Sequence, residues 1–221
     1  MRILITTAVL IQTLVMSVQA STVGWGAAID RGVGLSSPTT ATTAVLAGSL
    51  VRLGYYINTV TGLPLSNTEI QALASPANPN NKSNLDAAFR QYGQAQIGDG
   101  VGGENGVWSA SSSNSQAQFG GRTAYYWILN APSLGATTQY AIVTAAQFVF
   151  PADTATGQLT TDINQVTAQG IVVGEGFGTA TIFGSPGVPV VKLAPVPEPA
   201  TAFLSVVGLA AIASRRRRNR H

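Results

Sequence analysis

Two apolar segments, one at each end of the chain, limit how much of these 221 residues can form a folded domain. The first runs from Ile3 to Val18 and leads into the sequence Val18-Gln19-Ala20. Small residues at the last and third-last positions of such a segment are typical of a signal peptidase site. We therefore expect a signal peptide at residues 1–20, cleaved between Ala20 and Ser21. The alternative is an uncleaved N-terminal membrane anchor.

The second apolar segment, residues 200–214, is followed by a cluster of arginines: Arg215, Arg216, Arg217, Arg218 and Arg220. A helix of this length rises about 22 Å, short of the roughly 30 Å hydrocarbon core of a bilayer. Neighbouring residues, local thinning of the bilayer and arginines that reach the interface can close the gap. Because positive residues concentrate on the cytoplasmic side, we expect a C-terminal transmembrane helix with the chain before Pro197 outside.

A short proline motif, Val196-Pro197-Glu198-Pro199, lies directly before this apolar segment. The order of Pro-Glu-Pro, one short hydrophobic helix and a terminal arginine cluster resembles the PEP-CTERM sorting signal of exported bacterial proteins. The resemblance covers only the tail, residues 196–221. It implies that exosortase, a membrane-embedded cysteine transpeptidase, cuts near Pro-Glu-Pro and that the protein is delivered to the cell surface or exopolysaccharide. The alternative is a plain tail anchor, in which Pro199 occupies the first turn of the helix.

The charge of the chain changes once these end segments are set aside. The isoelectric point of about 9.5 suggests nucleic acid or an anionic membrane as a partner. Between Ser21 and Pro195, however, six basic residues stand against eight acidic ones, a net charge of −2. The basic residues are also scattered singly, so they form no stripe that could bind phosphates. We expect no nucleic-acid partner.

The composition of the body, residues 21–195, favours a fold rich in strands and loops. The whole chain has 24 glycines and 11 prolines, only 10% charged residues, and no cysteine that could form a disulfide. We predict a single α+β domain, a mainly antiparallel β sandwich or open barrel with two short helices.

The strands are predicted from segments dense in β-branched and aromatic residues. These segments are a short strand around Trp25, then 49–57, 122–129, 139–150, 171–173 and 179–183. Segments 122–129 and 139–150 should pair as an antiparallel hairpin, and Pro186 should open a linker to the tail. Because Tyr125, Tyr126 and Trp127 are adjacent, at least one of them points inward, and we favour core packing over stacking on a sugar.

Two short helices are predicted between Ser66 and Tyr92. Ser66 and Glu69 form a capping box, so a helix should begin there and end before Pro76. Ser83 or Asn84 is suited to cap a second helix, with an apolar face made by Leu85, Ala88, Phe89 and Tyr92. A further helical turn is expected within 162–168.

The glycine-rich segment 98–106 contains Asp99, Glu104 and Asn105. Their oxygens suit Ca²⁺, but their spacing departs from that of an EF-hand loop. The flanks also lack the strand and helix that a dinucleotide-binding glycine motif requires. We favour a mobile surface loop and keep a calcium site as the alternative.

Few kinds of catalytic or metal-binding site are possible in the body, because the only histidine is His221 and there is no cysteine. Ser-His-Asp and Cys-His catalysis are excluded, as are ordinary zinc, copper and haem sites. We therefore expect no catalytic residues, no cofactor and no enzymatic activity. The interpretation we favour is a structural or adhesive protein in exopolysaccharide, with signal peptidase, exosortase and the membrane as partners. A carbohydrate-binding or carbohydrate-hydrolysing module, the latter using two carboxylates, is the alternative.

Overall fold

The computed structural model describes residues 21–27, 30–78, 80–114, 118–152 and 158–196. The predicted signal peptide, Pro197-Glu198-Pro199, the apolar segment 200–214 and the arginine cluster lie outside the described residues. Within the described part of the chain, no helix is long and apolar enough to cross a membrane. The division into signal peptide, body and tail therefore stays a prediction.

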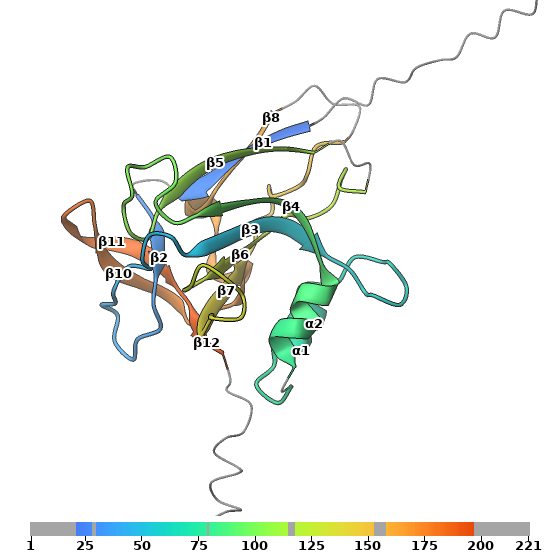
Figure 1. The fold of residues 1–221 in the computed structure, drawn as a ribbon, viewed down its shortest axis with the longest axis horizontal. Helices are drawn as coiled ribbons and strands as arrows, with labels where there is room; N and C mark the ends of the chain where they lie inside the picture. The colour runs from blue at the N-terminus through green and yellow to red at the C-terminus, as the bar shows by residue number, and fades with distance from the viewer. Residues whose placement is uncertain (1–20, 28–29, 79, 115–117, 153–157, 197–221) are drawn as a thin grey trace, which may run out of the picture.

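A six-stranded sheet forms the centre of the molecule (Figure 1). Its order is β12 (Ala194–Pro195), β7 (Gln139–Val143), β6 (Tyr125–Leu129), β3 (Leu50–Tyr56) and β4 (Phe89–Gln96), and β9 (Ile171–Val173) pairs with the same β7. All of these pairs are antiparallel. The predicted strands around 49–57 and 171–173 and the predicted hairpin are confirmed. The second hairpin strand ends at Val143, however, well before the predicted Phe150.

Two three-stranded sheets accompany the central one. The first has the order β5 (Trp108–Asn114), β1 (Ser21–Ala27) and β8 (Gln158–Asp162), and the second has the order β10 (Gly176–Ile182), β11 (Ser185–Lys192) and β2 (Gly32–Gly34). Each contains one parallel pair, β1 with β8 and β11 with β2. The fold is therefore mainly, but not entirely, antiparallel.

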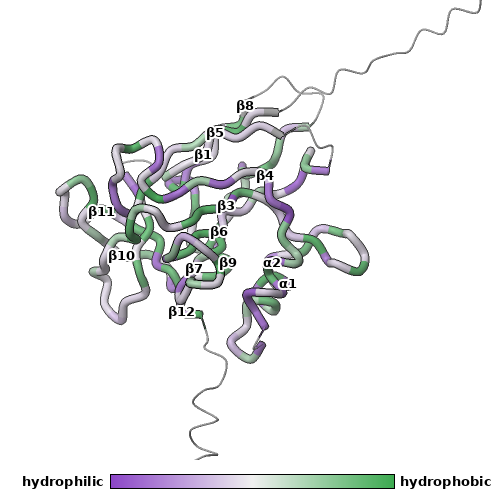
Figure 2. Tube along the Cα trace, in the orientation of Figure 1, coloured by the Kyte–Doolittle hydropathy of each residue, from purple (hydrophilic) through white to green (hydrophobic). Residues whose placement is uncertain are grey.

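The aromatic side chains of β6 show how the layers stack, because neighbouring strand residues point to opposite faces. The ring of Tyr126 lies 5.7 Å from both Trp25 of β1 and Trp108 of β5, which places the β5-β1-β8 sheet over one face of the centre. Trp127 points to the other face and contacts Phe89 at 5.5 Å. The predicted α+β fold with stacked sheets is confirmed, and the most apolar strands are those at its centre (Figure 2).

The helices α1 (Asn67–Ala74) and α2 (Asn81–Ala88) lie on the Trp127 side of the central sheet. The predicted capping box of α1 is confirmed: Ser66 accepts a hydrogen bond from the Glu69 amide, and the Glu69 carboxylate accepts one from the Ser66 amide. The prediction for α2 was wrong at both ends. This helix begins at Asn81 and ends at Ala88.

The second helix ends early because Phe89 and Tyr92 belong to strand β4. Residues 89–96 pair with β3, so a long-range partner overrides the local helical spacing of the apolar residues. A break in register between Leu53 and Gly54 accommodates the pairing. A Cβ on Gly54 would lie 2.2 Å from the Arg90 carbonyl oxygen, so this close approach requires glycine.

The region around Pro186 also differs from the prediction. Pro186 lies within β11, which forms a hairpin with β10, so it does not open a linker. The predicted helical turn is present as two 3-10 turns, Ile163–Gln165 and Ala168–Gly170. Asp162 caps the first of them, accepting a hydrogen bond from the Asn164 amide at 2.8 Å.

Candidate functional site

The aromatic side chains considered as a sugar platform belong to the core. All three tryptophans and all six tyrosines of the chain are buried, and the most exposed of them, Tyr55, is only 6% exposed. Tyr125, Tyr126 and Trp127 thus all point inward, two toward the helices and one toward the β5-β1-β8 sheet. None of these nine rings offers a face on which a sugar could stack.

One cation is held inside this aromatic cluster. The guanidinium of Arg52 lies 4.7 Å from the ring centre of Phe89 and 5.0 Å from that of Trp127. It also donates to Asp86 at 2.6 Å and to Gln91 at 2.7 Å. No role was predicted for Arg52, although a lone arginine in the middle of an apolar strand is a signal for one. Its contacts tie α2 to the central sheet.

The three residues considered for calcium bind backbone amides in three different segments. Asp99 accepts from the Gln96 amide at 2.7 Å, Glu104 from the Phe183 amide at 3.0 Å, and Asn105 from the Ala47 amide at 2.8 Å. Asp99 thus fixes the loop to the end of β4, and Glu104 and Asn105 fix it to two neighbouring turns. The described residues contain no group of three or more His, Cys, Asp or Glu side chains that could hold a metal ion.

Four other described carboxylates, those of Glu69, Asp86, Asp162 and Glu175, also serve local structure. Hydrogen bonds from the backbone and side chain of Ser66 lower the pKa of Glu69. Asp86 pairs with Arg52, and Asp162 caps the 3-10 turn. Glu175 accepts from Ser36 Oγ at 2.5 Å and lies 3.8 Å from Lys192 Nζ. These contacts do not form the pair of facing carboxylates that a glycosidase uses.

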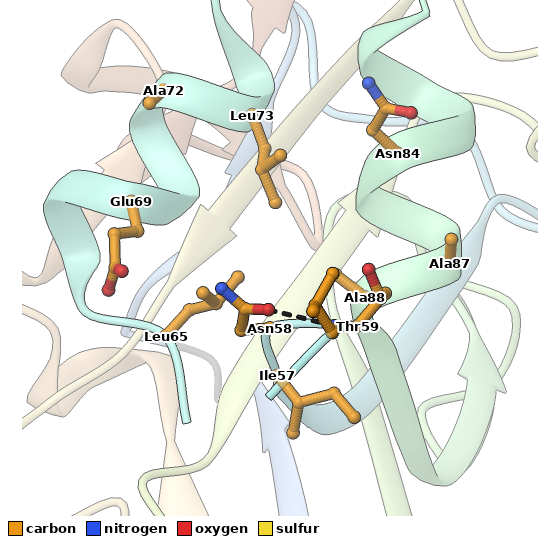
Figure 3. A pocket seen from close by; sticks show the side chains of 11 residues that line it. Ile57, Asn58, Thr59, Leu65, Glu69, Ala72, Leu73, Asn84, Ala87 and Ala88 are labelled. Carbon is orange, nitrogen blue, oxygen red and sulfur yellow. Dashed lines mark hydrogen bonds between the residues drawn. The ribbon is translucent and has the colours of Figure 1, made fainter. Parts of the chain in front are cut away.

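An open groove of about 430 Å³ lies between the two helices and the loop that precedes α1 (Figure 3). Leu73 points into the space between the helices, and Asn84 and Ala87 line it from α2. The loop contributes Ile57 and Leu65, together with Asn58, whose side-chain oxygen accepts a hydrogen bond from the Val60 amide at 2.9 Å. Glu69 is the one carboxylate among the described lining residues. No sequence pattern predicted this groove, because its lining comes from separate segments that only the fold brings together.

The exit of the C-terminal tail is the remaining site. Strand β12 pairs with the edge of β7, with Ala194 opposite Tyr140 and Pro195 opposite Gln139. The amide of Val196 then donates to the Thr138 carbonyl at 2.7 Å, and its side chain packs against the core. The first residue of the proline motif is therefore fixed to the folded domain, beside the connection between β6 and β7.

Two further segments converge on this exit. Lys82, in the first turn of α2, donates to the Thr137 carbonyl at 3.0 Å. The amide of Ser36 donates to the Gln139 side chain at 2.7 Å. The point at which the tail leaves is thus braced by the β6–β7 connection, the start of α2 and the loop that begins at Ser36.

Residues 195–218 match the family model of the PEP-CTERM protein-sorting motif. The chain carries a PEP-CTERM sorting motif. The match includes the predicted motif residues Val196, Pro197, Glu198 and Pro199 and most of the arginine cluster, and ends before Arg220. No curated protein and no solved structure matches the chain.

The sorting motif implies passage through a membrane, processing by exosortase and an extracellular destination. The match covers the tail alone, so it assigns no activity to the body. Of the residues singled out in the motif, only Val196 lies within the described part of the chain, and there it contacts the domain directly.

Proposed function

We propose that this chain is the precursor of a structural or adhesive protein of the cell surface or exopolysaccharide. Signal peptidase removes residues 1–20, the apolar segment 200–214 holds the intermediate in the membrane, and exosortase then processes the tail. The body, residues 21–195, is the part that remains outside.

The observation that carries a structural role is the burial of every tryptophan and tyrosine ring. These rings build a core on both faces of the central sheet, and burying such large apolar groups is a major source of stability. The tryptophan and tyrosine rings, which could otherwise stack on a ligand, are buried in the fold instead. Most described carboxylates are likewise committed to caps, turns and ion pairs. A stable domain with these features suits a building unit better than an enzyme.

The proposed route is tested by mass spectrometry of the protein isolated from its native cell. We expect the surface fraction to begin at Ser21 and to end near Pro197 to Pro199. A matched variant, Glu198→Ala, should accumulate with the arginine cluster attached. An intact arginine cluster in the surface fraction of the native protein would contradict processing at the motif.

The groove beside the helices supports carbohydrate binding as a second candidate function. The amides of Asn58 and Asn84 suit sugar hydroxyls, while Leu65 and Leu73 give apolar contact. Because Glu69 is the one carboxylate among the described residues of this groove and is engaged by Ser66, binding is better supported than hydrolysis.

A glycan array separates the two candidates. The mature protein should give no saturable binding if its role is structural. Binding that is lost in Asn84→Ala would favour the second candidate. Ser83→Ala is the matched control, because Ser83 is exposed on the same helix and does not line the groove.

A further inference from the structure

The folded domain ends very close to the segment that would enter the membrane. The amide of Val196 is hydrogen-bonded to the Thr138 carbonyl, and only Pro197, Glu198 and Pro199 separate Val196 from the apolar segment. Four fully extended residue steps, from Val196 to Ala200, span at most about 14 Å. The end of the domain therefore cannot stand far from the bilayer surface.

The polar layer of the bilayer fills much of this distance. A bilayer is about 40–45 Å thick with its headgroups and about 30 Å without them, which leaves roughly 5–8 Å on each side. We propose that, before processing, the end of the domain around the tail exit rests on the lipid headgroups of the membrane that holds the tail. This membrane-facing end comprises residues 130–138 and 36–43. The inference rests on the proposed membrane intermediate.

The composition of the membrane-facing end fits this partner. Neither 130–138 nor 36–43 contains a charged residue. Pro132, Ser133, Gly135 and Ala136 are exposed on the β6–β7 connection. The ammonium of Lys82 is turned onto this connection through its hydrogen bond to Thr137. The other charges that touch this end are held by partners on the domain: Lys192 donates to the Ser37 carbonyl and lies 3.8 Å from Glu175, which accepts from Ser36. Such a surface can approach zwitterionic headgroups with few charged groups to desolvate.

The opposite end of the molecule provides the internal control. The strands β1, β5 and β8 lie at the end of the view opposite β12 (Figure 1). Ser113 is exposed on β5, opposite Thr22 in the register of β1. A probe at Ser113 should therefore stay away from the bilayer while a probe at Ala136 lies against it.

Fluorescence quenching in vesicles tests this arrangement. Because the natural sequence has no cysteine, Ala136→Cys and Ser113→Cys each give a uniquely labelled full-length chain. The labelled chains are reconstituted into phosphatidylcholine vesicles whose headgroups carry a nitroxide quencher. We expect quenching at position 136 to exceed that at position 113 severalfold. A flexible Gly/Ser linker of about twelve residues, inserted between Val196 and Pro197, should remove most of the difference.

Flotation of the same samples distinguishes a failure of the proposed membrane intermediate from a failure of the inference about the domain end. A chain that does not float with the vesicles overturns the membrane intermediate and this inference together. A chain that floats but shows equal quenching at both positions overturns only the inference, as does a difference that the linker leaves unchanged. Flotation with strong, linker-sensitive quenching at position 136 supports both.

Discussion

At the scale of single residues, two buried tyrosine hydroxyls differ in their partners. The hydroxyl of Tyr126 shares a 2.5 Å hydrogen bond with Thr161 Oγ1. The hydroxyl of Tyr56 has no hydrogen-bond partner within the described part of the chain, although the residue is almost completely buried. An unsatisfied buried polar group costs about 1–3 kcal/mol, so the two hydroxyls should affect stability in opposite directions.

The matched pair Tyr56→Phe and Tyr126→Phe tests this contrast. We expect Tyr56→Phe to leave the free energy of unfolding unchanged or to raise it by about 1 kcal/mol, because it removes a hydroxyl without a partner. Tyr126→Phe should lower it by about 1–3 kcal/mol, because it leaves the buried Thr161 hydroxyl unsatisfied. Urea denaturation measures both. An equal loss in the two variants would mean that Tyr56 has a partner after all.

At the scale of elements, α1 depends on its first turn. The helix is only eight residues long, and isolated helices of that length are marginal in water. The capping box at Ser66 satisfies backbone amides that the helix itself leaves unpaired.

Replacing Ser66 should therefore destabilise the protein measurably. We expect Ser66→Ala to lower the free energy of unfolding by about 1 kcal/mol, a typical cost for losing an N-cap. Thermal or urea denaturation gives the value. Ser83→Ala, inside α2, should change it by less than about 0.5 kcal/mol, as exposed substitutions away from special features do. Similar losses in both variants would show that the cap carries little of the stability of α1.

The glycine-rich loop between β4 and β5 gives a second prediction at this scale. Because Asp99, Glu104 and Asn105 bind amides in three different segments, calcium is not needed to hold the loop in place. We expect the melting midpoints in millimolar calcium and in chelator to agree within about a degree, and Asp99→Ala to lower both equally. A site filled to about ten times its dissociation constant would instead raise the midpoint by roughly 2–4 °C.

The elements that the sequence predicted well are those whose signals are local. The capping box places α1, and the dense apolar segments place β3, β6 and β7. Strands β5 and β8 were missed because Trp108–Asn114 is mostly serine and both become strands only through pairing with the distant β1. Phe89 and Tyr92 of β4 were predicted to lie in a helix for the same reason: their strand partner, β3, is distant in sequence. Likewise, the proline motif identifies the tail exit, but no local pattern shows that Val196 is fixed to Thr138.

At the scale of the whole molecule, the burial of four tyrosines, Tyr56, Tyr125, Tyr126 and Tyr140, makes the folded domain less stable at high pH. Burial raises the pKa of Tyr140 to about 12 and holds those of Tyr56 and Tyr126 above the usual value. In the unfolded chain tyrosine ionises near pH 10. Above that pH the unfolded state releases protons that the folded state retains, so folding loses stability as pH rises.

We therefore expect these four tyrosines to contribute no pH dependence to the free energy of unfolding below about pH 9, and a steep fall above about pH 10. Urea midpoints between pH 8 and pH 11 measure the fall, and ultraviolet absorbance reports tyrosinate in the same samples. Tyrosinate should appear together with unfolding. Ionisation of these four tyrosines near pH 10 in a protein that remains folded would contradict the raised pKa values.

The position of β1 has a consequence for the timing of export. A chain that threads through a channel from its N-terminus delivers β1 first, yet Gly24 pairs with Thr160 of β8, which lies far along the chain. Until then Trp25 and Tyr126 lack part of the layer that covers them. The β5-β1-β8 sheet therefore closes only after most of the body has crossed, and strands β9 to β12 must still arrive before the sorting motif reaches the membrane.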